Sequence, residues 1–562
     1  MNPTLKRALL GLFVLSIAKL LTATLPAEDV VVAGGTPGGI AAAVSAARSG
    51  ASVVVLEESA HIGGIVAGGL TNTDIRKKGA VGGLFAEFVR RVREQYAKTY
   101  GADSAQVKMC QGGHMFEPKV AELVFREMLA GEKNVRLFER CRVISARVVG
   151  SNGVEREAEP GKRMDGTVPN DFGSPVKLVS LIVEDLAHPG QRTILKAGVF
   201  IDATYEGDVA ALAGVPYRVG RESRSAFGED PAGVIYMRFG DRNRLPGSTG
   251  AADDGIQGFC FRFHLTRDKT NSVPVEKPAD YNRDDYRAVL DDIHAGRVTK
   301  LNQVIQFYAM PNGKFEINSD HPHGDTGVPS ESLDLAEEDW GWPEAGPVER
   351  DRIFQRYWSH SEGLMWLLQH DEEIPAGIRA EAAPWGFPKD EFTDHRHRPH
   401  ALYVRQGRRI WGEYNFTERD ADLDNATGLP RRKPDGVAVA EFEFDSHGVH
   451  KYDPEHPGVR EGYIFIAHEP LQIPYRLLVP QRVDGLLVPL ACSASHVGYQ
   501  TIRMEPVFMA LGEACGIAAK TALKAKVAVR AVNVPDVQRE IIKRGGVILY
   551  EAQALAPESL KP

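Results

Sequence analysis

The sequence DVVVAGGTPGGIAAAVSAARSGASVVVLE, residues 29–57, determines the expected fold. Its first residues are apolar and β-branched, as in a buried strand, and a glycine-rich turn follows at 34–39. The small residues at 40–49 predict a helix that can pack closely against its neighbours. A second apolar strand at 52–56 ends in Glu57. The order strand, turn, helix, strand predicts a βαβ unit.

Each part of this unit suits a dinucleotide. A pyrophosphate is bound by backbone N–H groups at a helix N-terminus, where the chain must approach it without Cβ atoms. Gly34 permits the turn, Gly39 lets the helix pack on the strand, and Glu57 can accept hydrogen bonds from ribose hydroxyls. Thr36 takes the middle glycine position of the usual GxGxxG pattern. A glycine-rich string alone is weak evidence, so the prediction depends on the flanking strands and on Glu57.

The next segment, 58–70, contains two glycine pairs and suits an extended ligand better than the next helix of a nicotinamide enzyme. With the blocks 116–122, 201–208, 403–409, 492–497 and 503–506, the chain resembles the FAD-dependent oxidoreductase family, which is distantly similar to the fumarate reductase and succinate dehydrogenase flavoproteins. The resemblance covers nearly all of the chain after the N-terminus, includes Thr36 as a familiar variant, and implies FAD as the cofactor. In this first part of the chain the residues expected to bind it are Gly34, Gly35, Thr36, Pro37, Gly38, Gly39, Glu57, Glu58, Gly63 and Gly64.

A turn in the segment 198–213 is a further expected contact. Residues 198–201 predict a short buried strand, and a helix is expected at 209–213. The family resemblance implies that Asp202, Gly207 and Asp208 line the FAD channel. The alternative is a purely structural turn in which Asp208 caps the helix.

The C-terminal segment is expected to return to the nucleotide unit. Residues 484–489 predict a strand, and Pro506 starts a helix rich in Ala and Gly. Hydride transfer to a flavin leaves negative charge on the ring, which a helix N-terminus and a fixed arginine stabilise. We therefore expect Arg503 and Glu505 to contact the flavin and Arg503 to take part in catalysis. The alternative is a buried helix in which both residues pair with neighbours.

The expected fold class is α/β, with a Rossmann-type FAD-binding domain assembled from N- and C-terminal segments and an inserted α+β substrate or cap domain. The 562 residues exceed one ordinary core. We expect a signal peptide at 1–27, the two parts of the FAD-binding domain at 28–219 and 473–562, and the cap at 220–472. Helical spacing predicts a long cap helix at 350–369.

The N-terminus has the form of a signal peptide. Lys6 and Arg7 precede the apolar run 8–18, and the small residues at 22–27 offer a cleavage site. Lys19 interrupts the apolar stretch, and there is no twin-arginine pair. We expect a periplasmic or secreted protein without stable membrane insertion after signal removal. An uncleaved membrane anchor is the alternative.

Charge and metal-ligand content point to a small-molecule partner. The net charge is −8 with no long basic run, which argues against nucleic acid. The five cysteines include no CxxC pair and indicate neither a zinc site nor a disulfide framework. His395, His397 and His400 would share one face of a strand, but Arg396 and Arg398 add repelling charge, so no metal is expected.

Two histidines are candidate catalytic bases, because histidine is the usual side chain with a suitable pKa. His496 lies just before the expected flavin helix, and His447 lies in the cap. Arg405 or Arg409 could hold an anionic or polyol substrate, with surface salt bridges as the alternative.

The expected function is dehydrogenation of a small polar substrate, such as a sugar, polyol or hydroxy acid, by hydride transfer to flavin N5. The electron acceptor that reoxidises the flavin is not identified by the sequence. One alternative is reduction of an activated double bond, which predicts arginines around the N5 face of the flavin. Another is an exported flavin- or carbohydrate-binding protein without redox turnover.

Overall fold

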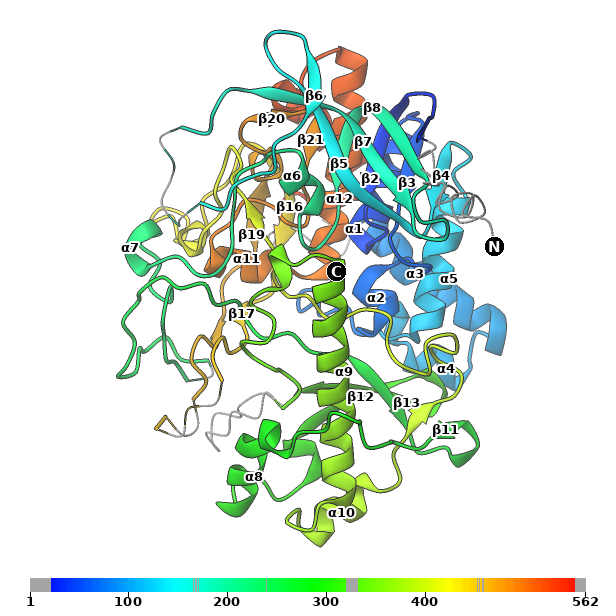
Figure 1. Ribbon diagram of the computed structural model, residues 1–562, viewed down its shortest axis with the longest axis vertical. Coiled ribbons are helices and arrows are strands. Elements are labelled where there is room, and N and C mark those ends of the chain that lie inside the picture. The colour runs from blue at the N-terminus through cyan, green and yellow to red at the C-terminus, as the bar shows by residue number, and fades with distance from the viewer. Residues whose placement is uncertain are drawn as a thin grey trace, which may run out of the picture.

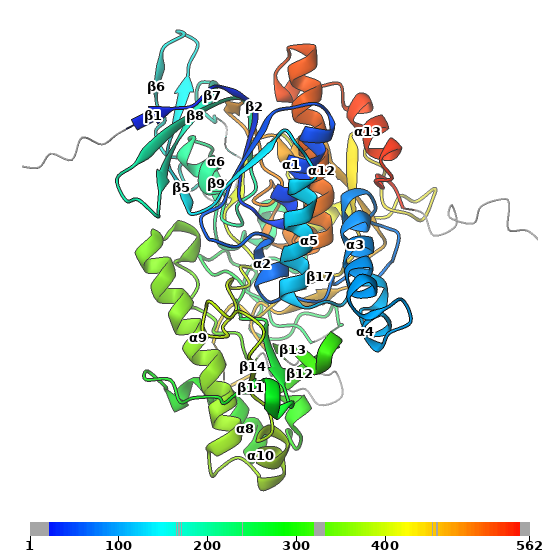
Figure 2. The same ribbon diagram turned by 90° about the vertical axis from the view of Figure 1, so that its right-hand side faces the viewer.

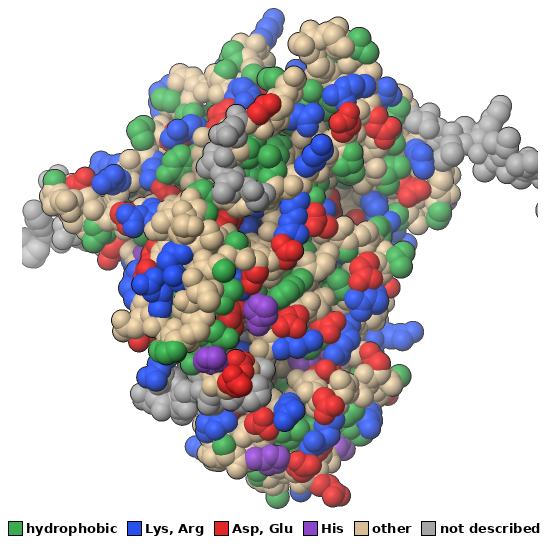
Figure 3. Space-filling model, turned by 60° about the vertical axis from the view of Figure 1, so that its left-hand side comes forward, with side chains coloured by type: hydrophobic (Ala, Val, Ile, Leu, Met, Phe, Trp, Pro, Cys, Tyr) green, Lys and Arg blue, Asp and Glu red, His purple; other side chains and the backbone are tan. Residues whose placement is uncertain are grey.

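The computed structural model of the chain describes residues 22–550, apart from positions 165, 167, 168, 170, 239, 320–331, 452, 454, 457 and 458. The basic and apolar parts of the predicted signal peptide lie outside the described residues. Figure 1 shows two regions, a large sheet with its helices above and a cap around α9 (Pro347–His370) below. On the face drawn in Figure 3, acidic and basic side chains are intermixed.

A ten-stranded sheet forms the centre of the upper region. Its main order is β4-β3-β2-β8-β7-β5-β6, and β1, β20 and β21 pair at its sides. The strands are β1 (Thr22–Thr24), β2 (Glu28–Ala33), β3 (Val53–Leu56), β4 (Val135–Phe138), β5 (Cys141–Val149), β6 (Glu155–Glu157), β7 (Val176–Asp185), β8 (Arg192–Asp202), β20 (Val483–Asp484) and β21 (Leu486–Leu487).

Strand β2 is apolar throughout because both of its faces are covered. Val30 and Val32 pack into the core on the helix side, whereas Val31 and Ala33 pack into a second core on the opposite side. Its neighbours β3 and β8 run parallel to it, with Val30 opposite Val53 and Val32 opposite Ile201. A parallel strand that is buried on both faces reads as a continuous apolar run rather than an alternation. The expected α/β class is confirmed.

The C-terminal part of the chain returns to the N-terminal part. Figure 2 shows α1 (Pro37–Arg48) beside α12 (Glu505–Ala525), with α3 (Gly83–Tyr100) and α5 (Pro118–Ala130) on the same side of the sheet. A Cβ at Gly512 would overlap with the carbonyl oxygen of Gly38. Glycine at this crossing therefore lets the two helices touch through their backbones, as the small residues of the sequence predict.

The cap contains a three-stranded antiparallel sheet in the order β10-β13-β12 and several helices. Helix α9 was expected at 350–369, and the structure extends it by a turn at its start. Trp358, Leu364 and Leu368 are buried in the cap core as predicted, while Trp366 is only partly buried. The main cap elements are β10 (Phe263–Thr266), β12 (Ile305–Met310), β13 (Lys314–Ser319), α8 (Arg287–His294) and α10 (Ala376–Ala382).

Shorter elements position the site. They are α2 (Gly64–Gly68), α4 (Ala105–Met109), α6 (Asp208–Leu212), β9 (Tyr217–Arg218), α7 (Arg224–Phe227), β11 (Ser272–Val273), β14 (Phe387–Pro388), β15 (Arg409–Ile410), β16 (Gly436–Ala440), β17 (Phe444–Ser446), β18 (Ile464–Ile466), β19 (Leu471–Pro474), α11 (His496–Ile502) and α13 (Val534–Lys543).

Three local predictions were wrong. The segment that contains His395, His397 and His400 is a series of turns rather than a strand, and His397 has a positive φ of 65°. Gly207, not Asp208, is the N-cap of α6. Arg405 and Arg409 are not surface residues, because the fold buries both of them.

Candidate functional site

The glycine-rich turn after β2 is a backbone surface without room for side chains. Gly34 has a φ of 100°, and a Cβ there would overlap with the carbonyl oxygen of Ala203 at the end of β8. A Cβ at Gly39 would overlap with the carbonyl oxygen of Gly34. Thr36 caps α1 by accepting from the backbone N–H of Gly39 at 3.1 Å, and it donates to the Ala203 carbonyl at 2.9 Å. The threonine thus joins the turn to β8, while Pro37 and Gly38 form the first turn of α1.

Glu57 lies beside this turn, as predicted. Its Oε2 accepts from the backbone N–H of Gly35 at 2.8 Å, and its Oε1 accepts from that of Ser59 at 2.8 Å. Burial raises the pKa of this carboxyl. Glu58 is different, because its half-exposed carboxylate forms an ion pair with Arg142 at 2.5 Å. Its role in cofactor binding stays a prediction.

The turn at 202–208 lies against the glycine turn through Ala203. Asp202 is fully buried and organises this turn, accepting from the Thr204 hydroxyl at 2.7 Å and from the Ala210 backbone N–H at 2.7 Å. Burial raises the pKa of Asp202 to about 6. Asp202 therefore shapes the segment that abuts the glycine turn.

Asp208 faces the cap instead. Its two oxygens pair with Arg350 of α9 at 2.6 Å and with Arg408 at 2.7 Å. Gly207 has a φ of 70°, and a Cβ there would lie 2.7 Å from that of Ala491. Both arginines lower the pKa of Asp208 against the opposing effect of its burial. Asp208 thus links the nucleotide unit to the cap.

The loop before α2 connects the glycine turn to the start of α12. The backbone N–H of Gly63 donates to the carbonyl of Gly35 at 2.6 Å, and Gly64 lies directly against the hydroxyl of Tyr205. That hydroxyl donates to Oε1 of Glu505 at 2.7 Å. Glu505 is buried, burial raises its pKa to about 8, and its Oε2 has no hydrogen-bond partner among the described residues.

These features fit a dinucleotide. The Cβ-free turn lies at the N-terminus of α1, which is the arrangement that binds a pyrophosphate, and Glu57 stands beside it for a ribose. The unpartnered oxygen of Glu505 lies at the start of α12, where the sequence places the flavin. The residues expected to bind FAD at 34–39, 63–64 and 505 therefore belong to one connected surface, as hydrogen bonds and close backbone contacts show.

A polar cavity of about 310 Å³ adjoins the start of α12. Arg503 and Met504, which directly precede that helix, both line it. The charged or titratable side chains on its wall are Asp74, Arg76, Arg262, Asp445, His447 and Arg503.

His447 on the cavity wall is held by a buried carboxylate. Its Nδ1 lies 2.5 Å from Oδ2 of Asp334, and Oδ1 of Asp334 lies 3.1 Å from Nη1 of Arg405. Arg405 also donates to the carbonyl of Gly258 and lies close to the sulfur of Cys260. An aspartate at Nδ1 keeps the proton of a neutral imidazole on that nitrogen, so the lone pair is on Nε2.

Arg503 is fixed in place by three hydrogen-bond partners. It donates to Oε1 of Gln500 at 3.1 Å, to the hydroxyl of Tyr403 at 3.1 Å, and to Oδ2 of Asp445 at 2.9 Å. The guanidinium therefore lies against the cavity wall with its charge balanced by a carboxylate.

Arg262 and Asp74 complete the charged wall. Arg262 forms a buried ion pair with Glu316. Burial raises the pKa of Asp74 to about 6, although Arg262 opposes this shift. Most of the positive charge around the cavity is thus matched by nearby carboxylates.

The second predicted base, His496, does not line this cavity. It is buried at the start of α11, where its backbone N–H donates to Oε2 of Glu222 at 2.8 Å, and its Nε2 lies 3.4 Å from the hydroxyl of Ser446. Burial, together with the charges of Arg409 and Arg221, holds the pKa of His496 well below its ordinary value. The geometry favours His447.

Potential metal ligands come together elsewhere. His61, Asp394 and His400 place ligand atoms within 4.8 Å of one another. The rings of the two histidines are stacked at 3.5 Å with only 13° between their planes. Nearly parallel stacked rings cannot both aim an in-plane lone pair at one ion, so this arrangement is a stacked ion-pair cluster. A second group, at Glu117, is filled by the ammonium of Lys314.

The sequence analysis missed Asp334, Arg262 and Asp74. They come from segments far apart in the chain, and none belongs to a recognisable local motif. The one available signal is that Asp74 follows closely on the glycine-rich loop 58–70.

Comparisons with known proteins follow from this geometry. A family model described as FAD dependent oxidoreductase matches residues 29–541. The comparison with curated proteins gives no match.

Among solved structures, a variant of the E. coli quinol fumarate reductase subunit FrdA is 12% identical, with 93% of this chain and 75% of that chain covered and a TM-score of 0.31. A geranylgeranyl bacteriochlorophyll reductase-like protein from Thermoplasma acidophilum is 10% identical, with 94% and 85% covered and a TM-score of 0.33. L-proline dehydrogenase from P. horikoshii is 16% identical, with 33% and 23% covered and a TM-score of 0.16. In several other matches the aligned region spans 66% or less of the other chain.

Proposed function

The chain belongs to the FAD dependent oxidoreductase family, and on that premise we propose that it dehydrogenates a small polar alcohol, with His447 as the base. Sugars, polyols and hydroxy acids are the substrate classes that we propose. The observation that carries the proposal is the pairing of His447 with the buried Asp334 on the wall of the polar cavity.

FAD, when bound, supplies the acceptor for the two electrons and the hydride that leave the substrate carbon. The protein supplies the base for the accompanying proton. Nε2 of His447 takes the hydroxyl proton as the C–O bond becomes a carbonyl, and the Asp334 carboxylate stabilises the imidazolium that forms. Arg405 keeps Asp334 in place.

The other polar groups of the cavity orient the substrate. Arg503 and Asp445 offer a donor and an acceptor side by side, which suits a hydroxyl-bearing molecule. A cavity of about 310 Å³ accommodates a molecule the size of a monosaccharide or a small hydroxy acid.

Reduction of an activated double bond is the second candidate. It is favoured by three arginines, Arg76, Arg262 and Arg503, on one cavity wall, which could hold an anionic acceptor. Two of them already form buried or half-buried pairs with Glu316 and Asp445, so the proposal places this reaction second.

The test is anaerobic bleaching of the yellow holoenzyme by a panel of sugars, polyols and hydroxy acids. We expect at least one donor to bleach the flavin, and His447→Gln to retain the flavin while slowing bleaching by about 10² to 10⁴-fold. His496→Gln is the matched control and is expected to have the smaller effect. No bleaching by any donor, together with reoxidation of the reduced flavin by fumarate-like acceptors, would favour the second candidate instead.

We also propose that the protein is exported, on the strength of the N-terminal charge and hydropathy pattern alone. Cell fractionation and N-terminal sequencing of the isolated protein test this. Recovery of the intact chain from the cytoplasm would contradict it.

A further inference from the structure

A second cavity of about 400 Å³ lies apart from the first and shares no lining residue with it. Its charged lining residues are Arg163, Arg218, Arg221, Glu222, Asp253 and Asp254. Asp254 and Arg163 are exposed or half-exposed, whereas Arg218 and Glu222 are buried. The cavity therefore leads from a solvent-exposed mouth to a buried arginine.

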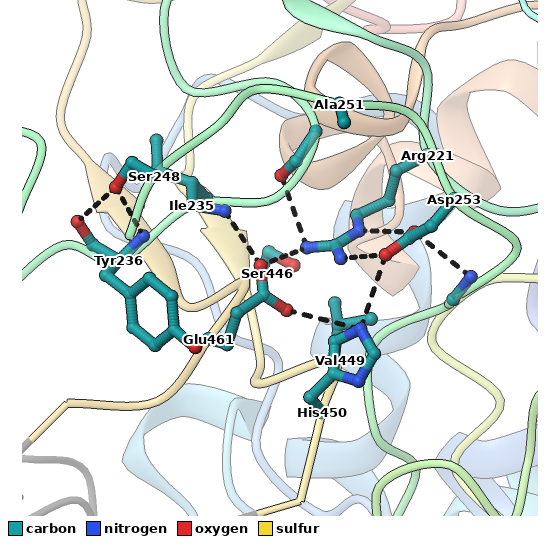
Figure 4. Close-up of polar contacts among 12 residues, drawn as sticks. Arg221, Ile235, Tyr236, Ser248, Ala251, Asp253, Ser446, Val449, His450 and Glu461 are labelled. Atoms are coloured by element: carbon teal, nitrogen blue, oxygen red, sulfur yellow. Dashed lines mark hydrogen bonds and ion pairs between the residues drawn. The ribbon is translucent and has the colours of Figure 1, made fainter. Parts of the chain in front are cut away.

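One buried arginine of this cavity, Arg221, is fully compensated. Figure 4 shows its guanidinium held by the carboxylates of Asp253 and Glu461 and by the carbonyl of Gly233. His450 joins the same network by contacting Asp253 at 3.3 Å. Arg221 thus needs no further anion.

Arg218 is compensated far less. It donates through Nη2 to Asn415 at 2.5 Å and to the carbonyl of Ala494 at 2.8 Å. Its Nε and Nη1 are buried without a hydrogen-bond partner among the described residues. The ring of Trp411 covers one face of the guanidinium at 3.9 Å, which leaves its edge for other contacts.

The charge around Arg218 is also incompletely balanced. Its nearest carboxylate, Glu222, lies 3.6 Å away and is shared with Arg409 at 3.2 Å. Burial raises the pKa of the next carboxyl, Glu229, to about 7, so it is only partly ionised at neutral pH. Burial lowers the pKa of Arg218 to about 10. Buried arginines are ordinarily paired, because an unpaired buried charge is costly.

The unpartnered groups around Arg218 are mainly donors. Nδ2 of Asn415 and Nε1 of Trp411 are buried without a partner, as are the two nitrogens of Arg218. The one unpartnered acceptor is Oε1 of Glu222, which already faces the arginines. An acceptor-rich ligand with negative charge would satisfy donors of this kind.

We propose that this cavity binds a small oxyanion, a carboxylate or a phosphate, through the buried edge of Arg218. Arg163 at the mouth adds a second positive charge on the entry path. The site is separate from the polar cavity that contains His447 and does not depend on the function proposed for that cavity.

The experiment measures binding of inorganic phosphate and, separately, of succinate to the purified holoenzyme by calorimetry. We expect saturable binding of at least one of them with one site per chain. Preference for one over the other distinguishes a phosphate site from a carboxylate site. Arg218→Met is expected to weaken that binding by about 10-fold or more, because a charge-assisted hydrogen bond is lost.

Asn415→Asp is a second variant that preserves shape. It places a carboxylate against Arg218 from within the protein, so it is expected to weaken anion binding to a similar degree even if Arg218→Met does not fold. Arg76→Gln, on the wall of the other cavity, is the control and should bind the anion as the wild type does. The proposal is overturned if the wild type binds neither probe, or if Asn415→Asp binds the anion as tightly as the wild type.

Discussion

The nucleotide end of the site and the polar cavity are built from different materials. At the turn after β2 the surface is backbone, and glycines at 34 and 39 leave no space for a Cβ. At the cavity wall the surface consists of charged side chains, such as His447, Arg503 and Arg262, which pair with carboxylates. The first region works by the absence of side chains and the second by their charge.

This difference predicts how each region responds to change. A backbone surface is rigid, so one added carbon atom has nowhere to go. A network of titratable side chains responds by degrees, through protonation and through the orientation of one group by another. The predictions below test the contrast from its largest expected effect to its smallest.

The largest effect is expected for Gly39→Ala. The added Cβ overlaps with the carbonyl oxygen of Gly34, and no rotamer can relieve a clash between backbone atoms. We expect loss of bound FAD and a loss of stability of about 1–3 kcal/mol. The flavin-to-protein absorbance ratio and thermal unfolding measure both effects. Gly341→Ala is the matched control, since its Cβ would meet nothing within 4 Å; if both variants retained flavin equally, the steric account would be wrong.

A smaller effect, on turnover alone, is expected for Asp334→Asn in the polar cavity. The amide cannot hold the proton of His447 on Nδ1 or stabilise the imidazolium, so kcat/KM should fall by about 10³-fold while FAD is retained. Steady-state kinetics with a donor found by the bleaching panel provide the measurement. An unchanged pH profile and rate in Asp334→Asn would show that His447 is not the base.

The sequence predicted the backbone part of the site well because that part is local. A strand, a glycine turn and a helix lie within thirty consecutive residues, and each residue type there has one dominant conformational reason. The same holds for the return of α12, whose small residues announce close packing.

The side-chain part could not be predicted in this way. Asp334 reaches His447 across 113 positions of the chain, and Arg262 reaches Glu316 across two strands of the cap sheet. Such pairs depend on tertiary packing and leave no periodic trace. For the same reason, the sequence gave His496 and His447 equal standing as bases, and only the fold separates them.

The next prediction concerns pH at the junction of the two regions. Burial raises the pKa of Glu505 from its ordinary value of 4.5 to about 8. The folded protein therefore binds this proton more tightly than the unfolded chain, so the contribution to stability is complete below pH 4.5 and declines as the pH rises towards 8. Glu505→Gln should remove this decline, on the order of 2 kcal/mol. Denaturant unfolding at pH 5 and pH 8 measures it, and equal pH dependence in both proteins would contradict the assignment.

The smallest effect is expected for Glu58→Gln, which tests two adjacent carboxylates against each other. Glu57 is tied to the glycine turn through Gly35, whereas Glu58 forms a half-exposed pair with Arg142. An exposed pair of this kind contributes about 1 kcal/mol or less, so Glu58→Gln should leave FAD retention and stability almost unchanged. Glu57→Gln should weaken FAD binding by about 10-fold, because a ribose hydroxyl then loses a charged acceptor. Titration of FAD into the two apoproteins compares them directly. If Glu58→Gln proved the more damaging, the carboxylate that follows β3 would have to be reassigned, and contact with the cofactor would extend beyond the backbone turn to the exposed edge of the sheet.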